Sequence, residues 1–370
     1  MPDSTPDSTP ASTPPLTPPL DLAADIVTLT AAICDIASVS GDEATLADAV
    51  EAALRTGTAL QVERHGNVVV ARTDLGRAER VLLAGHLDTV PLTDPPNLPT
   101  RLDGDQLWGR GTVDMKGGVA VQLRLAATVA QPRRDVTYVF YDNEEVESSK
   151  NGLGHLARSH PHLLAADFAV LLEPTNAQVE GGCKGTLRVE VEVPGKAAHS
   201  GRPWAGDNAV HKTGALLTKL AEHQARVVDV DGLTYHEGLS AVGIRGGTAG
   251  NVIPDRCVLT VNYRFAPDRS EQEALAFVRD FFAGYPVTVT DSAPGARPGL
   301  DRQAARDFIR DLDVPVTAKE GWTDVARFAQ FGVPAVNFGP GDPMLAHKED
   351  ERVPITQLRD AEAALLRWLG

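Results

Sequence analysis

Short apolar runs that alternate with helix-like stretches constrain the fold of this chain more than any other feature of its sequence. Helix-like stretches, such as residues 118–130, separate four apolar runs at residues 68–70, 81–84, 136–141 and 168–172. Runs as short and as uniformly apolar as these are typical of strands that are covered on both faces. The pattern therefore predicts an α/β domain with a largely buried sheet.

The chain before the first run reads as a tail followed by two helices. Residues 1–20 are almost all Pro, Thr, Ser and Asp, which cannot bury a core, so we expect a disordered tail there. Ser40 and Glu43 form a capping-box pattern, which predicts that a helix starts at this point. An earlier helix is predicted by apolar residues at helical spacing: Leu22, Ile26, Leu29 and Ile33.

The pattern changes after residue 182. Residues 186–193 read TLRVEVEV, the strict alternation of a half-exposed strand, and a second strand and a helix are expected at residues 257–265 and about 272–282. These elements predict a smaller α+β domain at residues 183–294, with an antiparallel sheet that carries helices on one face. Because the final helix Ile355–Leu369 resembles the first part again, the smaller domain is inserted into a larger one, residues 21–182 and 295–370.

Composition excludes some classes of partner. The formal net charge is −15, and no apolar run approaches the roughly 18 residues of a membrane-spanning helix, so we expect neither a nucleic-acid nor a membrane partner. An anionic small substrate remains compatible, because a few local Arg or Lys residues can dominate a pocket. Three widely spaced cysteines are typical of a reducing compartment, and the chain starts without a secretory signal. We therefore expect a cytoplasmic protein.

Metal-binding residue types follow the apolar runs. The second run is followed by His86 and Asp88, which lie two residues apart and so on one face of a strand. Ligands gather at the carboxyl ends of strands in α/β sheets, and a histidine beside a carboxylate is a common metal arrangement. Taken alone, this pair fits a surface turn about as well.

Further candidates lie in separate blocks of the sequence. Asp114 lies in the glycine-rich segment WGRGTVDMKGG, where an anionic side chain would repel a phosphate but suits a cation. Glu144 and Glu145 follow the third run, Glu173 ends the fourth, and His347 follows a later strand at residues 335–338. A solvated acidic loop and a plain surface histidine are the alternatives for these blocks.

The five groups together are more specific than any one of them. Two histidines and three carboxylates suit two divalent ions, with zinc favoured because it accepts mixed nitrogen and oxygen ligands without redox chemistry. One carboxylate must then bridge both ions. The predicted ligands are His86, Asp114, Glu145, Glu173 and His347.

In this order the blocks resemble the M20 family of metallopeptidases and deacylases, from about residue 22 to residue 370. The resemblance implies a zinc-peptidase-like catalytic domain, with a mixed sheet and helices on both faces, and two Zn²⁺ ions that Co²⁺ can replace. By this resemblance Asp114 bridges the two ions. His86 and Glu173 hold one ion, and His347 and Glu145 hold the other.

The same resemblance implies the catalytic residues. Glu144 is the general base that takes a proton from the attacking water, and Asp88 acts beside His86. In the smaller, lid domain the block GKAAHSGRP makes His199 a stabiliser of the oxyanion, often in the partner subunit's site, whereas its plainer interpretation is a turn histidine. We expect a homodimer that pairs through this domain, with the alternating strand at residues 186–193 as the pairing edge.

Within the family, four stretches resemble an actinobacterial branch that cleaves N-succinyl-LL-2,6-diaminopimelate to succinate and LL-2,6-diaminopimelate in lysine biosynthesis. They are residues 141–148, 180–189, 321–328 and 338–352. Asn251 begins another matching block, NVIP, and Arg264 falls where relatives bind a substrate carboxylate. The candidates for binding the carboxylates of this anionic substrate are Lys184, Arg202, Arg245, Arg264 and Arg327.

Two alternatives stay open at this point. One is another N-acyl amino acid hydrolase of the family, such as an acetylornithine deacetylase or a carboxypeptidase; Val146 and residues 322–327, where many relatives differ, lie near the acyl recognition region. The other is a non-catalytic metal-binding scaffold. Glu144 beside Glu145 weighs against a scaffold, because a protein that only binds metal has no use for the base.

Overall fold

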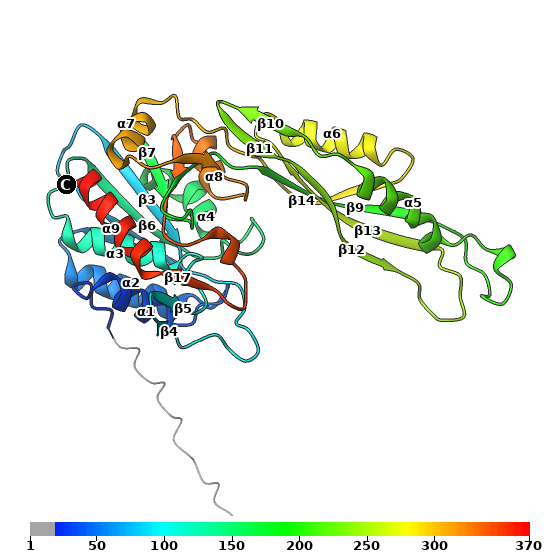
Figure 1. Cartoon of the computed structure of the whole chain (residues 1–370), viewed down its shortest axis with the longest axis horizontal. Coiled ribbons are helices and arrows are strands. Elements are labelled where there is room, and N and C mark those ends of the chain that lie inside the picture. Colours follow the sequence, from blue (N-terminus) through cyan, green and yellow to red (C-terminus); the bar gives the residue numbers. More distant parts are fainter. Residues whose placement is uncertain (1–18) are drawn as a thin grey trace, which may run out of the picture.

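A mixed sheet of eight strands, in the order β1-β2-β6-β3-β7-β16-β8-β15, forms the centre of the larger unit (Figure 1). The computed structural model describes residues 19–370, so most of the expected tail lies outside the described residues. β3, β6, β7 and β16 run parallel to their neighbours within this group, and β1, β2 and β8 introduce antiparallel pairs. The bounds are β1 (Gln61–His65), β2 (Val68–Arg72), β3 (Arg80–His86), β6 (Asp135–Tyr141), β7 (Phe168–Leu171), β8 (Val179–Gly181), β15 (Val316–Ala318) and β16 (Ala335–Asn337).

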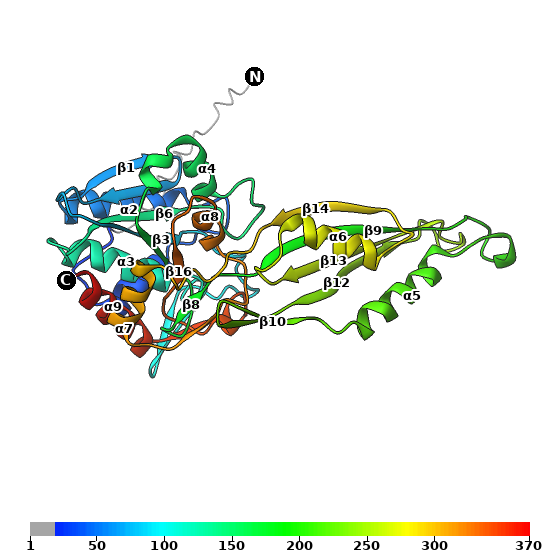
Figure 2. The ribbon, with the colours of Figure 1, turned by 90° about the horizontal axis from the view of Figure 1, so that it is seen from above.

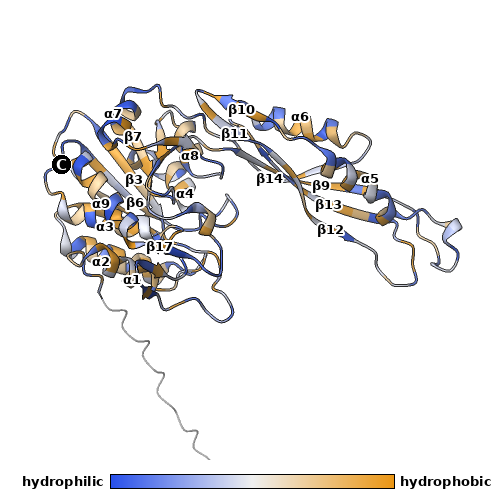
Figure 3. Ribbon diagram, in the orientation of Figure 1, coloured by the Kyte–Doolittle hydropathy of each residue, from blue (hydrophilic) through white to orange (hydrophobic). Residues whose placement is uncertain are grey.

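Helices cover both faces of this sheet, as the apolar runs predict. Successive strand residues point to opposite faces, so Leu83 packs with one set of helices while Leu82 and Ala84 pack with the other. The central strands β3, β6 and β7 are accordingly buried on both sides, and they carry orange, hydrophobic stretches in Figure 3. The first face carries α1 (Ile26–Cys34), α2 (Ala44–Gly57), α3 (Lys116–Thr128), α7 (Gln303–Leu312) and α9 (Ile355–Leu369). The second carries α4 (Gly152–Ser159), the 3₁₀ helix η1 (Pro161–Leu164) and α8 (Val325–Gln330).

The helix expected near Ser40 is present as α2, but the predicted capping box is wrong. Ser40 Oγ donates a 2.7 Å hydrogen bond to Asp88 Oδ2, and α2 begins without any side-chain cap. The Glu43 carboxylate accepts from the backbone N–H groups of Gly41 and Asn143. Both residues therefore hold the loops around Asp88 together, a long-range role that a local sequence pattern does not reveal.

The smaller unit is a four-stranded antiparallel sheet in the order β12-β13-β9-β14, with two helices on one face (Figure 2). The expected pairing edge is wrong, because the strand at residues 186–193 lies in β9, between β13 and β14. The described edges of this sheet are β12 and β14. The elements are β9 (Gly185–Pro194), α5 (Ala209–Glu222), β12 (Gly238–Gly246), β13 (Arg256–Phe265), α6 (Glu271–Phe281) and β14 (Val287–Ala293).

Two chain crossings connect the units. Cys183 and Ala296 exchange two backbone hydrogen bonds of 3.0 Å, so the outgoing and returning segments run side by side. The hairpin β10 (Val227–Val230) and β11 (Leu233–His236) adds a third contact, since Tyr235 Oη donates to the carbonyl of Gly181 at 2.7 Å. We propose that the smaller domain spans residues 183–294, between these crossings.

The remaining elements are short. A three-stranded sheet joins β4 (Arg101–Asp103), β5 (Gln106–Trp108) and β17 (Arg352–Pro354), and two 3₁₀ helices are η2 (Pro203–Ala205) and η3 (Pro343–Leu345). The three cysteines, at positions 34, 183 and 257, are free and buried. Among the helices of residues 19–370, none has the length and apolar character needed to cross a membrane.

Candidate metal centre

The parallel strands β3, β6 and β7 place the predicted site at one edge of the large sheet. β6 and β7 flank β3, so the loops that follow all three strands leave from the same edge. His86 ends β3, Glu144 and Glu145 lie in the loop after β6, and Glu173 lies two residues after β7. The prediction that carboxylates and a histidine gather at strand ends follows directly from this topology.

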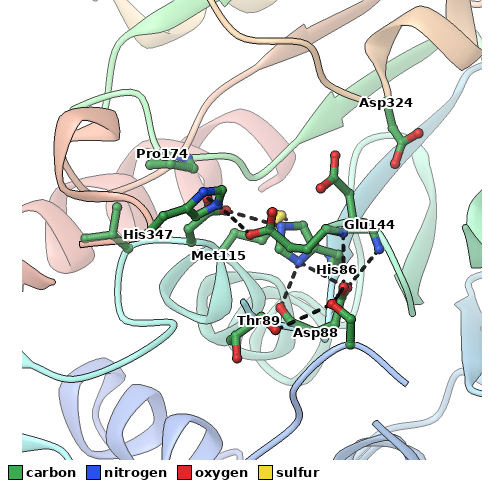
Figure 4. A network of polar contacts seen from close by, with 12 residues as sticks. His86, Asp88, Thr89, Met115, Glu144, Pro174, Asp324 and His347 are labelled. Carbon is green, nitrogen blue, oxygen red and sulfur yellow. Dashed lines mark hydrogen bonds and ion pairs between the residues drawn. The ribbon is translucent and has the colours of Figure 1, made fainter. Parts of the chain in front are cut away.

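Asp114 and His347 reach the same edge from two loops. Asp114 Oδ1 lies 3.2 Å from His86 Nε2, and its other oxygen, Oδ2, lies 3.3 Å from His347 Nε2. His347 Nε2 is also 2.9 Å from Glu145 Oε1. Figure 4 shows His86 and His347 on the two sides of this network. Asp114 therefore lies between the two histidines, with one carboxylate oxygen toward each.

These residues form two overlapping groups of three. In the first, His86, Asp114 and Glu173 offer ligand atoms that all lie within 4.8 Å of one another. In the second, Asp114, Glu145 and His347 meet the same criterion. The two groups share Asp114 alone, and together they contain all five residues proposed from the sequence as ligands.

The carboxylates of the site are buried close together, and both burial and their mutual repulsion raise the pKa values of Glu144 and Glu173. Burial raises the pKa of Glu173 to about 7, and the charge of Asp114 adds to the shift. Burial also raises the pKa of Glu144 well above its usual range; the charge of His86 opposes this, while Glu145 and Glu173 reinforce it. A divalent cation among these oxygens would relieve the repulsion.

The donor set fits a metal pair. Glu173 Oε1 is buried and has no hydrogen-bond partner among the described residues, which leaves an oxygen free for a cation. Imidazole nitrogens with carboxylate oxygens are the mixed ligands that zinc accepts. His86 and Glu173 would hold one ion and His347 and Glu145 the other, with Asp114 shared.

Asp88 fixes the backbone of the acidic loop that contains Glu144 and Glu145. Its Oδ1 accepts from the backbone N–H of Glu144 at 3.0 Å, and its Oδ2 accepts from that of Glu145 at 3.1 Å. His86 Nδ1 lies 3.0 Å from the Asp88 carbonyl oxygen and 3.4 Å from Oδ1. Although burial opposes ionisation, the contacts with His86 and with Ser40 hold the pKa of Asp88 below its usual value. Asp88 is thus a positioning residue, which orients a histidine and two glutamates at once.

The structure adds positioning residues that the sequence did not single out. Asp324 lies beside Glu144 (Figure 4), accepts from Asn151 Nδ2 at 3.0 Å and pairs with the guanidinium of Arg327. Arg327 also donates to Ser148 Oγ at 3.0 Å, so this candidate substrate cation ties the acidic loop to α8. The signal that could have found Asp324 was its place in the block at residues 321–328.

Glu351 and Lys319 act on the metal loops in the same way. Glu351 Oε1 accepts from the backbone N–H groups of Val113 and Asp114 at 3.0 and 3.2 Å, and its Oε2 pairs with Arg110 at 2.7 Å. Lys319 Nζ donates to the carbonyl of Pro174 at 3.1 Å, next to Glu173. Glu351 could have been noticed, since it lies four residues after His347 in the same block.

The site residues proposed in the smaller unit lie at its two opposite ends, with His199 and Asn251 at the outer end. His199 and Asn251 lie in adjacent loops, where Ser200 N donates to the Asn251 carbonyl at 2.9 Å and His199 bridges to Val252. These loops flank η2 at the tip of the smaller unit, far from the large sheet in Figure 1. The structure therefore does not bring His199 and Asn251 together with the metal ligands of the same chain.

Lys184 and Arg264 lie at the opposite, inner end of the smaller unit. The Lys184 ammonium pairs with Glu320 at 2.7 Å and donates to the carbonyl of His236 at 2.6 Å. Arg264, near the end of β13, has no ion pair or side-chain hydrogen bond among residues 19–370. Of the remaining candidate cations, Arg245 pairs with Glu190 and Arg202 is exposed near the tip.

A mixed α/β fold with this set of histidines and carboxylates defines a metal-dependent hydrolase. The chain belongs to peptidase family M20/M25/M40, whose model matches residues 82–370. This confirms the resemblance drawn from the motifs and the fold class that it implied.

Three comparisons describe how close the relatives are. The chain is 56% identical, over 95% of its length and 99% of the relative, to a protein of Mycobacterium tuberculosis that is provisionally named a succinyl-diaminopimelate desuccinylase. It is 46% identical, over 95% and 97%, to the succinyl-diaminopimelate desuccinylase of Corynebacterium glutamicum. A dinuclear metal-binding peptidase of Bacillus subtilis shares the fold, with a TM-score of 0.66, 16% identity and coverage of 93% and 96%.

Proposed function

We propose that this chain is a two-metal amidohydrolase that cleaves N-succinyl-LL-2,6-diaminopimelate into succinate and LL-2,6-diaminopimelate, in the cytoplasm. The observation that carries the chemistry is the pair of ligand groups that share Asp114, with Glu144 beside them. The substrate is supported by 56% and 46% identity to two proteins named as desuccinylases of this compound.

Two Zn²⁺ ions, which Co²⁺ can replace, complete the proposed site. When bound, they lower the pKa of water and polarise the amide carbonyl. Elemental analysis of active protein should find two divalent ions per chain, and chelation should abolish turnover. Active protein that contains no zinc, cobalt or manganese would end the two-metal proposal.

Glu144 moves the proton in the proposed reaction. Its backbone is fixed by Asp88, and its carboxylate belongs to neither group that shares Asp114 but lies within 4.8 Å of ligand atoms of His86 and Glu145. It takes a proton from the attacking water and returns it to the leaving amine, as general acid–base catalysis requires. Asp88 positions its backbone, while the negative charge of Asp324 lies beside it and adds to the raised pKa that burial gives Glu144.

His199 is proposed to stabilise the oxyanion in the partner subunit's site. Gly201 N–H donates a 2.9 Å hydrogen bond to His199 Nδ1, so the neutral ring carries its proton on Nε2. That N–H is a preorganised donor for the developing negative charge. The position of His199 at the tip of the smaller unit supports action on a second subunit.

The edge strand β12 is the proposed pairing edge of the homodimer. Its Val242 and Ile244 are 59% and 53% exposed, an apolar edge that invites pairing with another strand. Ile244→Lys should yield a monomer in light scattering. The matched control is Val289→Lys on the opposite edge strand, β14, which should leave the dimer intact. Equal behaviour of the two variants would remove β12 from the proposal.

The substrate is tested directly by parallel assays. Zinc-loaded protein should cleave N-succinyl-diaminopimelate far faster than acetylornithine or a dipeptide. A site that offers a cation to the succinyl carboxylate leaves this cation unpaired when an acetyl group binds instead. Turnover of acetylornithine as fast as of the succinyl compound would transfer the assignment to the deacetylases.

A further inference from the structure

The tip of the smaller unit carries a tryptophan that its own chain leaves uncovered. Trp204 lies in η2 and is 81% exposed, the largest exposed fraction among the large hydrophobic residues in the described part of the chain. Trp108 and Trp322 are half-buried, and Trp368 is buried. A tryptophan that becomes covered removes about 150–250 Å² from solvent, and tryptophan is enriched among the residues that dominate protein interfaces. The exposure of Trp204 therefore indicates contact with another molecule.

Backbone hydrogen bonds fix the shape of this tip. Lys196 and Asp207 exchange two of them, of 2.8 and 2.9 Å, and so close the loop that contains both His199 and Trp204. Within the loop, the Arg202 N–H donates to the His199 carbonyl at 2.8 Å, so the turn that starts at His199 leads directly into η2. Trp204 follows His199 by five residues, which keeps their Cα atoms at most about 18 Å apart. A surface that receives His199 therefore has Trp204 nearby.

Two exposed apolar residues flank the metal centre of the larger unit. Val146 follows the proposed ligand Glu145 and is 37% exposed, and Met344 lies in η3, three residues before His347, and is 69% exposed. No other exposed large hydrophobic residue of the described chain lies within five residues of a proposed metal ligand. Because His347 Nε2 and Glu145 Oε1 are 2.9 Å apart, the segments that bear Val146 and Met344 meet at this ligand group.

The exposed tryptophan and this apolar rim are separated within one chain. The tip lies at the far end of the smaller unit from the large sheet (Figure 1). In a homodimer in which His199 acts at the partner subunit's metal centre, Trp204 arrives at that same centre. The side chain of His347 is 53% exposed, so this side of the centre faces solvent and has room for a partner.

We propose that Trp204 of one subunit packs against Met344 and Val146 of the partner subunit, at the rim of the partner's metal centre. This inference rests on the proposed function, because it requires that His199 act across the dimer. The thioether of a methionine makes favourable contacts with an aromatic ring, and its flexible side chain adapts to the shape of an indole. Twofold symmetry gives two such contacts per dimer, one at each metal centre.

A double-mutant cycle tests whether Trp204 contacts Met344. In the metal-loaded protein, Trp204→Ala should lower kcat/KM for N-succinyl-diaminopimelate by about 10- to 100-fold, the range for a truncated interface anchor. Met344→Ala should lower it less, and the double variant should stay within about threefold of Trp204→Ala alone, since the contact is already lost.

The matched control is Leu102→Ala, which removes a side chain that is 57% exposed on β4. Its effect should multiply with that of Trp204→Ala. Met344→Ala effects that multiply in the same way, or a Met344→Ala variant with wild-type kcat/KM, would overturn the proposal. A Trp204→Ala variant that changes KM alone and shows no coupling to Met344 would assign the indole to the substrate instead.

Mixed dimers test whether the contact crosses between subunits. Trp204→Ala chains retain an intact metal centre, and Glu144→Gln chains retain an intact tip. A mixed dimer therefore contains one site with both groups, and mixing should raise the activity of Trp204→Ala chains severalfold. No rise in verified mixed dimers would confine the effect of Trp204 to its own chain and overturn the proposal.

Tryptophan fluorescence separates this inference from the proposed function, whose failure is visible as a wild type that does not cleave the succinyl compound. Acrylamide should quench the dimer less than monomer obtained by dilution, because the dimer covers the most exposed tryptophan of the described chain. Trp204→Phe should remove this difference. Equal quenching of dimer and monomer, or a protein that is a monomer at every concentration, would overturn the contact whatever the substrate.

Discussion

Replacing Asp88 with asparagine should loosen the metal centre without touching any proposed metal ligand. The Asp88 carboxylate accepts from the backbone N–H groups of Glu144 and Glu145, one on each oxygen, and Ser40 Oγ donates to the second oxygen at 2.7 Å. An asparagine side chain has the same shape but only one acceptor oxygen. One of the two backbone N–H groups must then face an NH₂ group.

The magnitude follows from these contacts. A buried donor left without an acceptor costs about 1–3 kcal/mol, and the hydrogen bond that remains loses about 1 kcal/mol because its acceptor is no longer charged. The total of about 2–4 kcal/mol is concentrated in the loop that holds Glu144 and Glu145. Loss of a residue that orients metal ligands weakens metal affinity or activity by about 10–100-fold.

Two measurements check this expectation in Asp88→Asn. Zinc affinity, measured against a competing chelator, should fall by about 10–100-fold. Hydrogen exchange should speed up at the amides of Glu144 and Glu145, whose acceptors are changed. The matched control is Ser40→Ala, which removes the hydroxyl donor but leaves both backbone acceptors, and should have the smaller effect. Wild-type zinc affinity together with unchanged exchange in Asp88→Asn would refute this account of the loop.

Three further predictions concern other parts of the chain. Glu144→Gln should fold and retain its metals in elemental analysis, yet lose about 10²–10⁴-fold in kcat, because an amide cannot accept the proton; near wild-type turnover would place the base elsewhere. Mixing inactive Glu144→Gln chains with inactive His199→Ala chains should restore part of the activity, since one mixed site regains both groups, and no rescue in verified mixed dimers would place His199 outside the partner subunit's site. Asp135 has a pKa lowered from 3.8 to about 2, because hydrogen bonds from Leu75, Thr73 and Arg77 outweigh its burial. Its ionised form therefore stabilises the fold above pH 3.8, and this contribution is lost as the pH falls toward about 2. The melting temperature of Asp135→Asn should accordingly lie below that of wild type at pH 7 and approach it in acid, and a constant difference at all pH values would contradict this.

The sequence predicted those parts of the site that depend on strand ends. His86 and Glu173 lie at the carboxyl ends of buried strands, so the apolar runs that identify the strands also locate the ligands. Asp114 and His347 lie in loops, where no periodicity places a side chain. Their approach to within 3.3 Å of each other is fixed by tertiary contacts such as those of Glu351, which a single sequence does not display.

The sequence misled where a local pattern competes with a distant partner. Ser40 and Glu43 have the spacing of a capping box, but Asp88 offers the Ser40 hydroxyl a buried charged acceptor. The alternation in residues 186–193 correctly predicts a strand with one buried face. It contains no information on how many neighbours the strand has, because the pattern reports the faces of a sheet and not its edges. The pairing of β9 on both sides depends on β14, a strand that lies about a hundred residues later.

The backbone bridge between Cys183 and Ala296 brings together the two points at which the chain leaves the larger unit and returns to it. Residues in such a hydrogen-bonded antiparallel pair have Cα atoms about 5.5 Å apart, a gap that a two-residue turn closes. Residues 184–295 thus form a cassette whose two ends meet at a single point on the larger unit. A different domain with closely spaced termini could be grafted at this point without cutting the eight-stranded sheet, since both crossings lie outside its strands.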